Sequence, residues 1–401
     1  MKIIATFSIV LTIIVFSCKN YTSQVEVDFH PLQIKFNEFS NGQTRFSDYI
    51  DTIIIYQLDQ IDSNQLIFIQ FDKIIQIDSV FLVLDGKTST VGLYNLNGSF
   101  ISKVGNRGTA PGEYQEARDI VFDRKSNLIS ILSTSNYTIY RYDLNGKFVD
   151  NQKFDFPLYS FAMTEDGNYC FFNGYSAKDN YDVYLTDFRG KVKDKYFEYP
   201  EGNYPSLFDY MGIIKNSGFD VYYLPILSNI IYKYSKLTKN GFVAQYKIDI
   251  DHRLWPDHKK YNLEEFLATR SSNDPSSLLL KWFEIDPIND WIVMSYQKGR
   301  YWRNAYYNLI NKAGLVHENI IRDPIWNLVS SNHPIGISTE PTGGIFYFIS
   351  DELLALNKKD NKSESYLEFP ISKEDVNKLT EVVETNSDKI VLRLVLDKND
   401  K

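Results

Sequence analysis

The sequence predicts an all-β protein, a six-bladed β-propeller, on the basis of three observations. A short hairpin motif recurs at nearly regular spacing, aromatic and β-branched runs are frequent throughout, and no linker divides the 401 residues. A repeat of about 45 residues is typical of one four-stranded propeller blade. A closed ring of such blades explains the length of the chain as a single domain.

The recurring motif is a pair of short strands joined by a tight turn. It occurs at Tyr94–Phe100 and Tyr142–Phe148, and in a looser form at Leu185–Val192. Asn-Gly is favoured in a two-residue hairpin turn, which needs positive φ at both central positions. Gly98 and Gly146 are 48 residues apart, and Gly190 follows after 44, which suits one blade per repeat.

The later markers give the number of blades. Gly241 follows Gly190 by 51 residues, whereas Gly314 follows Gly241 by 73. The longer gap exceeds a blade of about 45 residues by roughly 28, so we predict an insertion between blades at residues 251–280. A sixth, degraded marker is expected near Lys359. Six blades fit this spacing better than five or seven.

The composition predicts where the strands lie and how the ring closes. The chain has 29 Tyr and 27 Phe, and runs such as Val80–Leu84 and Ile345–Ile349 read as strands. A ring must join its ends, so Ile53–Tyr56 is predicted to complete the blade made by Ile345–Ile349 and Ile390–Leu396. Residues 46–401 are assigned to the propeller. Within the insertion, apolar residues at helical spacing predict a short amphipathic helix over Tyr261–Arg270.

The N-terminus has the form of a bacterial lipoprotein signal. Lys2 is followed by the apolar run Ile3–Phe16, which is shorter than the roughly 20 residues that span a bilayer. Val15–Cys18 resembles a lipobox, so residues 1–17 are predicted to be removed, Cys18 to carry lipid, and residues 18–45 to form a tether. The predicted partner is then a membrane, bound through the lipid anchor. The predicted location is the cell envelope, at the outer membrane. The alternative is an ordinary secretory signal with Cys18 incidental.

Charge and cysteine content narrow the function classes. The net charge of −8 argues against nucleic acid as a partner, because a basic stripe would be expected. Only Cys18 and Cys170 exist, so no disulfide framework is available. Cys170 lies in an apolar strand and is predicted to be a small buried hydrophobe.

The most distinctive motif is the loop Gly105–Tyr114, with the sequence GNRGTAPGEY. It lacks the ending of a phosphate-binding loop and joins two strands, so we interpret it as a shaped loop between blades. With the Asn-Gly hairpin before it, this loop resembles the six-bladed β-propeller lipoproteins of Bacteroidetes, which are related to NHL-type propellers. Ala110 stands where that family usually has Gly. The resemblance covers residues from about Asp48 to Leu396 and implies the fold without assigning a reaction.

Two groups of residues are candidate sites. His252 and His258, with Asp251 and Asp257, have a spacing seen among zinc ligands, but nothing completes the set. No metal, cofactor or catalytic residue is therefore predicted.

Aromatic residues and cations crowd one blade edge. Rings and cations together suit sugars or acidic ligands, although alternate residues of a strand face opposite sides and half the rings should fill the core. The group comprises Tyr296, Lys298, Arg300, Tyr301, Trp302, Arg303, Tyr306 and Tyr307. We predict that Trp255, Tyr301 and Trp302 contribute to a ligand surface on the face that carries the insertion.

Two functions from different classes follow. The first is a non-catalytic binding or scaffold module for a glycan or a surface protein. The alternative, implied by the resemblance, is a lactonase-type or lyase-type enzyme that holds a divalent metal on the axis. Glu113, Asp119 and Glu284 are the acids to test for such a site.

Overall fold

A computed structural model describes most of the chain. The described residues are 30–36, 44–59, 70–174, 179–199, 213–238, 240–250, 264–265, 279–298, 301–316, 320–321, 329, 334–349 and 389–397. Predictions for Cys18, His252, Trp255, His258 and the marker near Lys359 concern residues outside these ranges.

The described residues form an all-β structure; besides one turn of 3-10 helix, only Glu264, Glu265 and Val329 among them are helical. The elements are β1 (Leu32–Lys35), β2 (Thr44–Arg45), η1 (Phe46–Tyr49), β3 (Ile50–Leu58), β4 (Lys73–Ile77), β5 (Val80–Asp85), β6 (Thr90–Asn95), β7 (Phe100–Lys103), β8 (Asp119–Asp123), β9 (Leu128–Ser133), β10 (Thr138–Tyr142), β11 (Phe148–Lys153), β12 (Ser160–Met163), β13 (Tyr169–Phe172), β14 (Tyr181–Thr186), β15 (Val192–Glu198), β16 (Ile213–Ser217), β17 (Asp220–Leu224), β18 (Ile230–Tyr234), β19 (Phe242–Asp249), β20 (Leu279–Asp286), β21 (Trp291–Lys298), β22 (Tyr301–Asn308), β23 (Ala313–Val316), β24 (Ile320–Ile321), β25 (Pro334–Ile337), β26 (Ile345–Ile349) and β27 (Lys389–Leu396).

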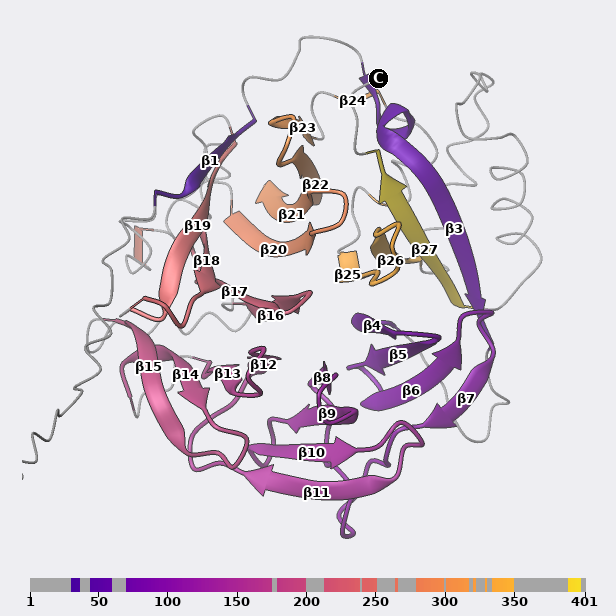
Figure 1. Ribbon diagram of the computed structural model, residues 1–401, viewed down its shortest axis with the longest axis vertical. Helices are drawn as coiled ribbons and strands as arrows, with labels where there is room; N and C mark the ends of the chain where they lie inside the picture. The colour runs from indigo at the N-terminus through magenta and orange to yellow at the C-terminus, as the bar shows by residue number, and fades with distance from the viewer. Residues whose placement is uncertain are drawn as a thin grey trace, which may run out of the picture.

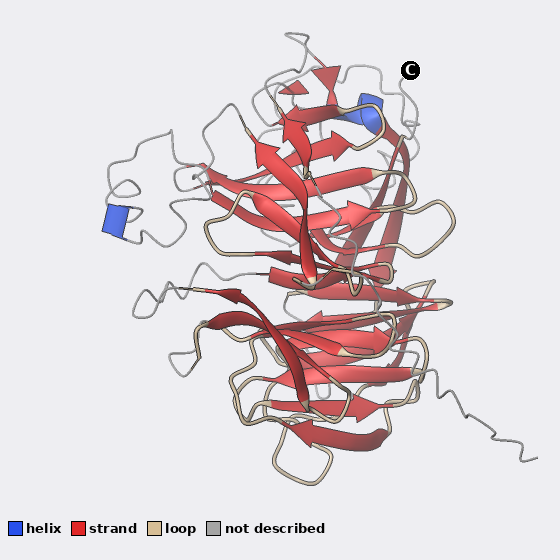
Figure 2. Cartoon of the chain, turned by 60° about the vertical axis from the view of Figure 1, so that its left-hand side comes forward, coloured by secondary structure: helices blue, strands red, loops and turns tan. Residues whose placement is uncertain are grey.

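These strands form a ring of six antiparallel blades, as the sequence predicts (Figure 1). Five blades are built from consecutive strands: β4–β7, β8–β11, β12–β15, β16–β19 and β20–β23. Each innermost strand contacts the innermost strands of both neighbouring blades, which closes the ring around a central axis. Figure 2 shows the blades from the side, with strands making up nearly all of the described structure.

The sixth blade closes the ring with strands from both parts of the chain. Its order is β25-β26-β27-β3, so the N-terminal β3 is its outermost strand. β3 pairs antiparallel with β27 along its whole length, from Ile50 opposite Leu396 to Leu58 opposite Lys389. The predicted closure by Ile53–Tyr56 is therefore confirmed.

The marker hairpins hold a different turn from the one predicted. In the first, the Gly98 amide donates to the Asn95 carbonyl, and the Asn95 side-chain oxygen accepts from the amides of Asn97 and Ser99. Gly98 has φ 89°, whereas Asn97 is not among the residues with positive φ. The turn is thus a longer loop with one left-handed residue and a bulge, rather than a two-residue turn with two. In the next two blades, the side chains of Asp143 and Asp187 each accept hydrogen bonds from two turn amides in the same way.

Contact with the preceding blade explains why the marker residue is glycine. A Cβ at Gly98 would lie 1.8 Å from the Gln57 carbonyl oxygen in β3, and one at Gly146 would lie 2.4 Å from the Lys103 oxygen in β7. Each hairpin therefore packs against the outermost strand of the blade before it. Gly314 is an exception, because it lies within β23 and the turn before it ends at Lys312, so its use as a turn marker was wrong.

The N-terminal segment also reinforces the outside of the ring. β1 adds a fifth, parallel strand to the edge of β19, and β2 pairs parallel with β24. Phe36 and Phe46 anchor this segment by ring contacts with Tyr307 and Tyr306, respectively. The region assigned as tether up to residue 45 is thus partly structural.

The core consists of apolar layers between neighbouring blades, where alternate strand residues from two sheets meet. Cys170 is fully buried and unpaired, and burial raises the pKa of its thiol, which confirms its prediction as an inert core residue.

The helical insertion is not supported. Of Tyr261–Arg270 only Glu264 and Glu265 are described; both are helical, but two residues do not establish a helix. Among the described residues, no helix is long and apolar enough to cross a membrane.

Candidate functional site

Residues from all six innermost strands, β4, β8, β12, β16, β20 and β25, line a cavity of about 1730 Å³, which therefore follows the axis of the ring. We call it the axial cavity. All six innermost strands begin at the same end, which we call the start mouth, and end at the opposite end mouth. The start mouth is lined by residues that include Gln70, Asp72, Lys87, Arg118, Tyr159 and Lys281. The end mouth is lined by residues that include Asp78, Asp123, Arg124, Lys125, Glu165 and Glu340.

One acid–base pair lies between β4 and β8. The Lys73 Nζ donates to Asp119 Oδ1 at 2.7 Å, and the other Asp119 oxygen accepts from the Phe161 amide in β12 at 3.0 Å. The Asp119 side chain is only 11% exposed. This carboxylate therefore cross-links the innermost strands of three successive blades.

A second, more deeply buried pair lies between β16 and β20. Lys215 Nζ donates to Glu284 Oε1 and, at 2.9 Å, to the Phe283 carbonyl, and it lies 4.3 Å from the centre of the Trp282 ring. The side chains of Lys215 and Glu284 are 6% and 4% exposed. Burial lowers the pKa of Lys215 and raises the pKa of Glu284, and each partner opposes the shift of the other. The pair is held together because each charge compensates the burial of the other.

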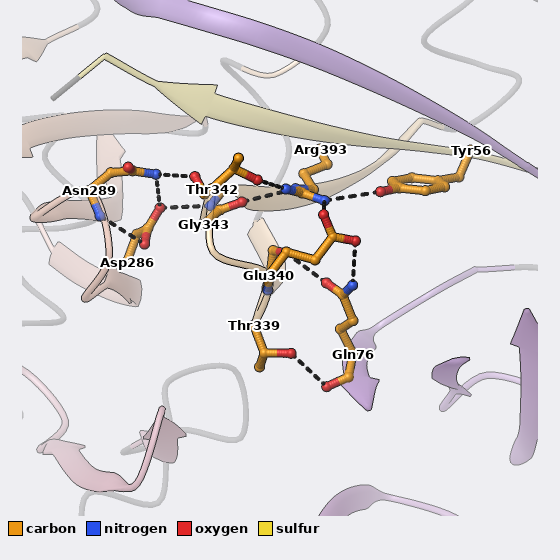
Figure 3. Close-up of polar contacts among 11 residues, drawn as sticks. Tyr56, Gln76, Asp286, Asn289, Thr339, Glu340, Thr342, Gly343 and Arg393 are labelled. Carbon is orange, nitrogen blue, oxygen red and sulfur yellow. Dashed lines mark hydrogen bonds and ion pairs between the residues drawn. The ribbon is translucent and has the colours of Figure 1, made fainter. Parts of the chain in front are cut away.

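The closing blade holds a third polar network, shown in Figure 3. Arg393 in β27 is fully buried and donates to Glu340 at 2.5 Å, to the Gly343 carbonyl at 2.9 Å and to the Tyr56 hydroxyl at 3.2 Å. Gln76 in β4 donates to the other Glu340 oxygen at 2.8 Å. Burial acts to raise the pKa of Glu340, but hydrogen bonds from Arg393 and Gln76 hold it below its ordinary value. The network connects the last blade to the first.

Polar side chains of the innermost strands cross every one of the six junctions between neighbouring blades. Besides the contacts above, Asn216 exchanges two hydrogen bonds with the Met163 backbone, and Asp286 accepts from the Gly344 amide at 2.8 Å. Neighbouring innermost strands belong to different sheets, so no ladder of backbone hydrogen bonds joins them. Side chains supply the hydrogen bonds between blades instead. Most buried charge around the axis is therefore committed to holding the blades together.

The described residues around the axis do not fit a resident divalent cation. Such a cation needs several oxygen ligands from converging carboxylates or carbonyls. Asp119 and Glu284 each bind a lysine instead, and the described residues contain no group of three or more His, Cys, Asp or Glu that could hold a metal.

The predicted acids divide between two places. Asp119 and Glu284 both line the axial cavity, whereas Glu113 lies in the loop after β7, where its carboxylate accepts from the Ala110 amide at 3.0 Å. That loop closes on itself, with the Gly108 amide donating to the Tyr114 carbonyl at 2.9 Å. Tyr114 is completely buried. The interpretation of Gly105–Tyr114 as a shaped loop between blades is confirmed.

The predicted aromatic group is largely core. Tyr296, Tyr306 and Tyr307 are buried at 0%, 0% and 3% exposure. Tyr301 and Trp302 lie in β22, where the structure describes their backbone only. The backbone register places Trp302 opposite Gln297, which in turn lies opposite Leu279 at the beginning of β20. Their role at a ligand surface, like that of Trp255, remains a prediction.

Sequence reasoning missed Lys73, Lys215 and Arg393. The available signal was a basic residue within an apolar strand run, as in Lys73–Ile77 and Lys389–Leu396. A charge at such a position must find a partner when its strand is buried. The sequence does not say which partner, because the partners come from other blades.

The fold defines this protein as a six-bladed β-propeller with an axial cavity. Its sequence matches the family described as "Domain of unknown function (DUF4934)" over residues 31–391, and the chain belongs to that family. No curated protein matches the sequence.

Several solved structures are similar to this chain at low sequence identity. The chain is similar to a candidate exported protein of Bacteroides fragilis NCTC 9343 at 14% identity and a TM-score of 0.68, over 91% of this chain and 99% of that one. A member of the DUF4221 family from Bacteroides vulgatus matches at 9% identity and a TM-score of 0.47, over 86% and 96%. A catalytically inactive virginiamycin B lyase from Staphylococcus aureus matches at 12% identity and a TM-score of 0.41, over 74% of this chain and 96% of that one. This similarity is too slight to bear on activity. The first similarity supports the fold alone.

Proposed function

We propose that this protein is a non-catalytic binding module of the cell envelope that is anchored by lipid on Cys18 and takes its ligand at the axial cavity. The observation that carries the proposal is the cavity of about 1730 Å³ whose central carboxylates are both engaged by lysines. A cavity of this size can bury much of a ligand. Carboxylates used as cross-links are poorly placed to act as general bases or metal ligands.

The ligand is a glycan or a surface protein, and we assign it to the start mouth. Trp255, Tyr301 and Trp302 are the proposed contact residues beside the cavity. Support comes from β20, which begins at Leu279 at this end of its blade, where the predicted insertion of residues 251–280 ends. Insertions in loops can shape a binding surface without disturbing the strands.

The binding proposal is tested with a glycan and surface-protein screen, followed by titration of a hit. Ala variants of Trp255 and Trp302 should weaken binding, because aromatic contacts contribute about 0.5–1.5 kcal/mol beyond their buried area. Phe188→Ala is the matched control, since this ring is 55% exposed in the turn between β14 and β15. Full affinity in the Trp255/Trp302 double variant would remove both residues from the site.

Anchoring at the outer membrane is the second part of the proposal. Its support is the signal-like run before Cys18. Multiple acyl chains would hold the protein stably at about 0.8 kcal/mol per buried CH₂. Labelling of cells with a fatty acid should be lost in Cys18→Ala and retained in Cys170→Ala. Equal label in wild type and Cys18→Ala would contradict the anchor, and separation of inner and outer membranes tests the location.

A further inference from the structure

Charge is distributed unequally along the axial cavity. The residues that line its first part, from the start mouth to the first innermost-strand residues, include four cations and two carboxylates: Lys73, Lys87, Arg118, Lys281, Asp72 and Asp119. The lining of the end mouth includes two cations and four carboxylates: Arg124, Lys125, Asp78, Asp123, Glu165 and Glu340. The chain as a whole carries a net charge of −8. The start mouth is therefore a locally positive concavity on an acidic protein.

Arg118 is the best oriented of these cations. Its guanidinium lies 4.9 Å from the centre of the Tyr159 ring, and its Nη2 donates to the Tyr159 hydroxyl at 2.9 Å. Among the described residues, its Nη1 and Nε make no hydrogen bond. A guanidinium fixed on a ring with donors still available can bind a planar carboxylate through two bonds at small entropic cost.

Lys87 contributes a second available charge. It is exposed in the loop between β5 and β6, and its ammonium has no hydrogen-bond or ion-pair partner among the described residues. The neighbouring Gly86 amide donates to Asp72 at 2.7 Å, and the same Asp72 carboxylate accepts from the Gln70 side chain. Asp72 is thus engaged in shaping the mouth, and its carboxylate also interacts electrostatically with Arg118. Lys87 and Arg118 both line this mouth.

We propose that the start mouth binds an oligosaccharide that carries carboxylate groups, and that Arg118 and Lys87 bind these carboxylates. The inference rests on the proposed function of the cavity and names its ligand class. Tyr159 and Trp282 line the same cavity, each with a cation against its ring, so that rings and cations together form the lining. Such a lining suits sugars, and its cations select acidic over neutral ones.

The test is titration of the mature chain with uronic acid tetramers, of galacturonate, glucuronate and mannuronate type, each beside its carboxyl-reduced counterpart. Reduction removes only the carboxylate charge, so at least one acid tetramer should bind about tenfold or more tightly than its reduced form. The preference should shrink as salt is raised, because the mouth is open to solvent.

Matched variants localise the effect. Arg118→Gln and Lys87→Gln should each lower the affinity for the acid tetramer several-fold and leave the affinity for the reduced form nearly unchanged. Arg124→Gln and Lys125→Gln, at the end mouth, are the controls and should change neither. Circular dichroism of each variant shows that the ring is intact.

Different results would contradict this inference and the proposed binding function of the cavity. Equal binding of acid and reduced tetramers would overturn the recognition of carboxylates by Arg118 and Lys87, and the cavity would remain a glycan site. Tighter binding of a hexaglutamate peptide than of any tetramer would overturn the assignment to sugars. Loss of acid-tetramer affinity only in the end-mouth variants would overturn the position of the site.

Discussion

Replacing Lys215 by Met should destabilise the protein strongly, because it leaves Glu284 buried without its partner. The two side chains are 6% and 4% exposed, so water cannot replace the lost ion pair. Breaking such a pair from one side costs about 3–5 kcal/mol. Unfolding entropy is about 2.1 cal/mol/K per residue, or about 0.8 kcal/mol/K for this chain, so a loss of about 4 kcal/mol lowers the Tm by about 5 °C.

The pH dependence of this variant follows from the same pair. Burial raises the pKa of Glu284 above 4.5 and Lys215 opposes that rise, so its removal lets the pKa rise further. A carboxyl whose folded pKa is raised destabilises the fold as pH increases from its unfolded pKa through its folded pKa. Lys215→Met should therefore regain stability as the pH falls toward about 4.5, relative to wild type at the same pH.

Calorimetry at several pH values, with two companion variants, decides whether this reasoning holds. The double variant Lys215→Met/Glu284→Leu removes both charges and should recover most of the stability. Lys233→Met breaks a pair with Asp220 in which the side chains are 32% and 47% exposed, and should cost at most about 1 kcal/mol. A Tm for Lys215→Met within 1 °C of the Lys233→Met value would refute the structural role of the buried pair.

Three further outcomes follow from the ring and its core. Gly98→Ala should lower the denaturant midpoint more than Gly167→Ala, because both have positive φ but only a Cβ at Gly98 meets backbone, and equal losses would contradict the packing of the hairpin. A chain beginning at Gln65 lacks β3 and should aggregate, as light scattering would show, because it exposes the edge of β27; a monomeric chain with unchanged unfolding would disprove closure by β3. Cys170 should react with a thiol reagent only after denaturation, since it is fully buried, and prompt labelling of the native protein would contradict that burial.

The sequence alone determined the number of blades, the turn positions of four blades and the strand that closes the ring. Local signals carry this information, because a turn glycine and an alternating strand act within a few residues of themselves. Gly314 shows the limit, since a glycine can also be required inside a strand, where a Cβ would lie 2.5 Å from the Tyr306 carbonyl oxygen. Spacing could not distinguish the two cases.

Only the tertiary structure decided what the charged residues do. Asp119 and Glu284 were identified as axial acids from the sequence, but their lysine partners are 46 and 69 residues away in neighbouring blades. Arg393 finds Tyr56 from the opposite end of the chain, 337 residues away. A side chain near the axis meets whichever strand the ring places beside it. The choice between metal ligand and cross-link is therefore made by the closure of six sheets around one axis, and no local pattern records it.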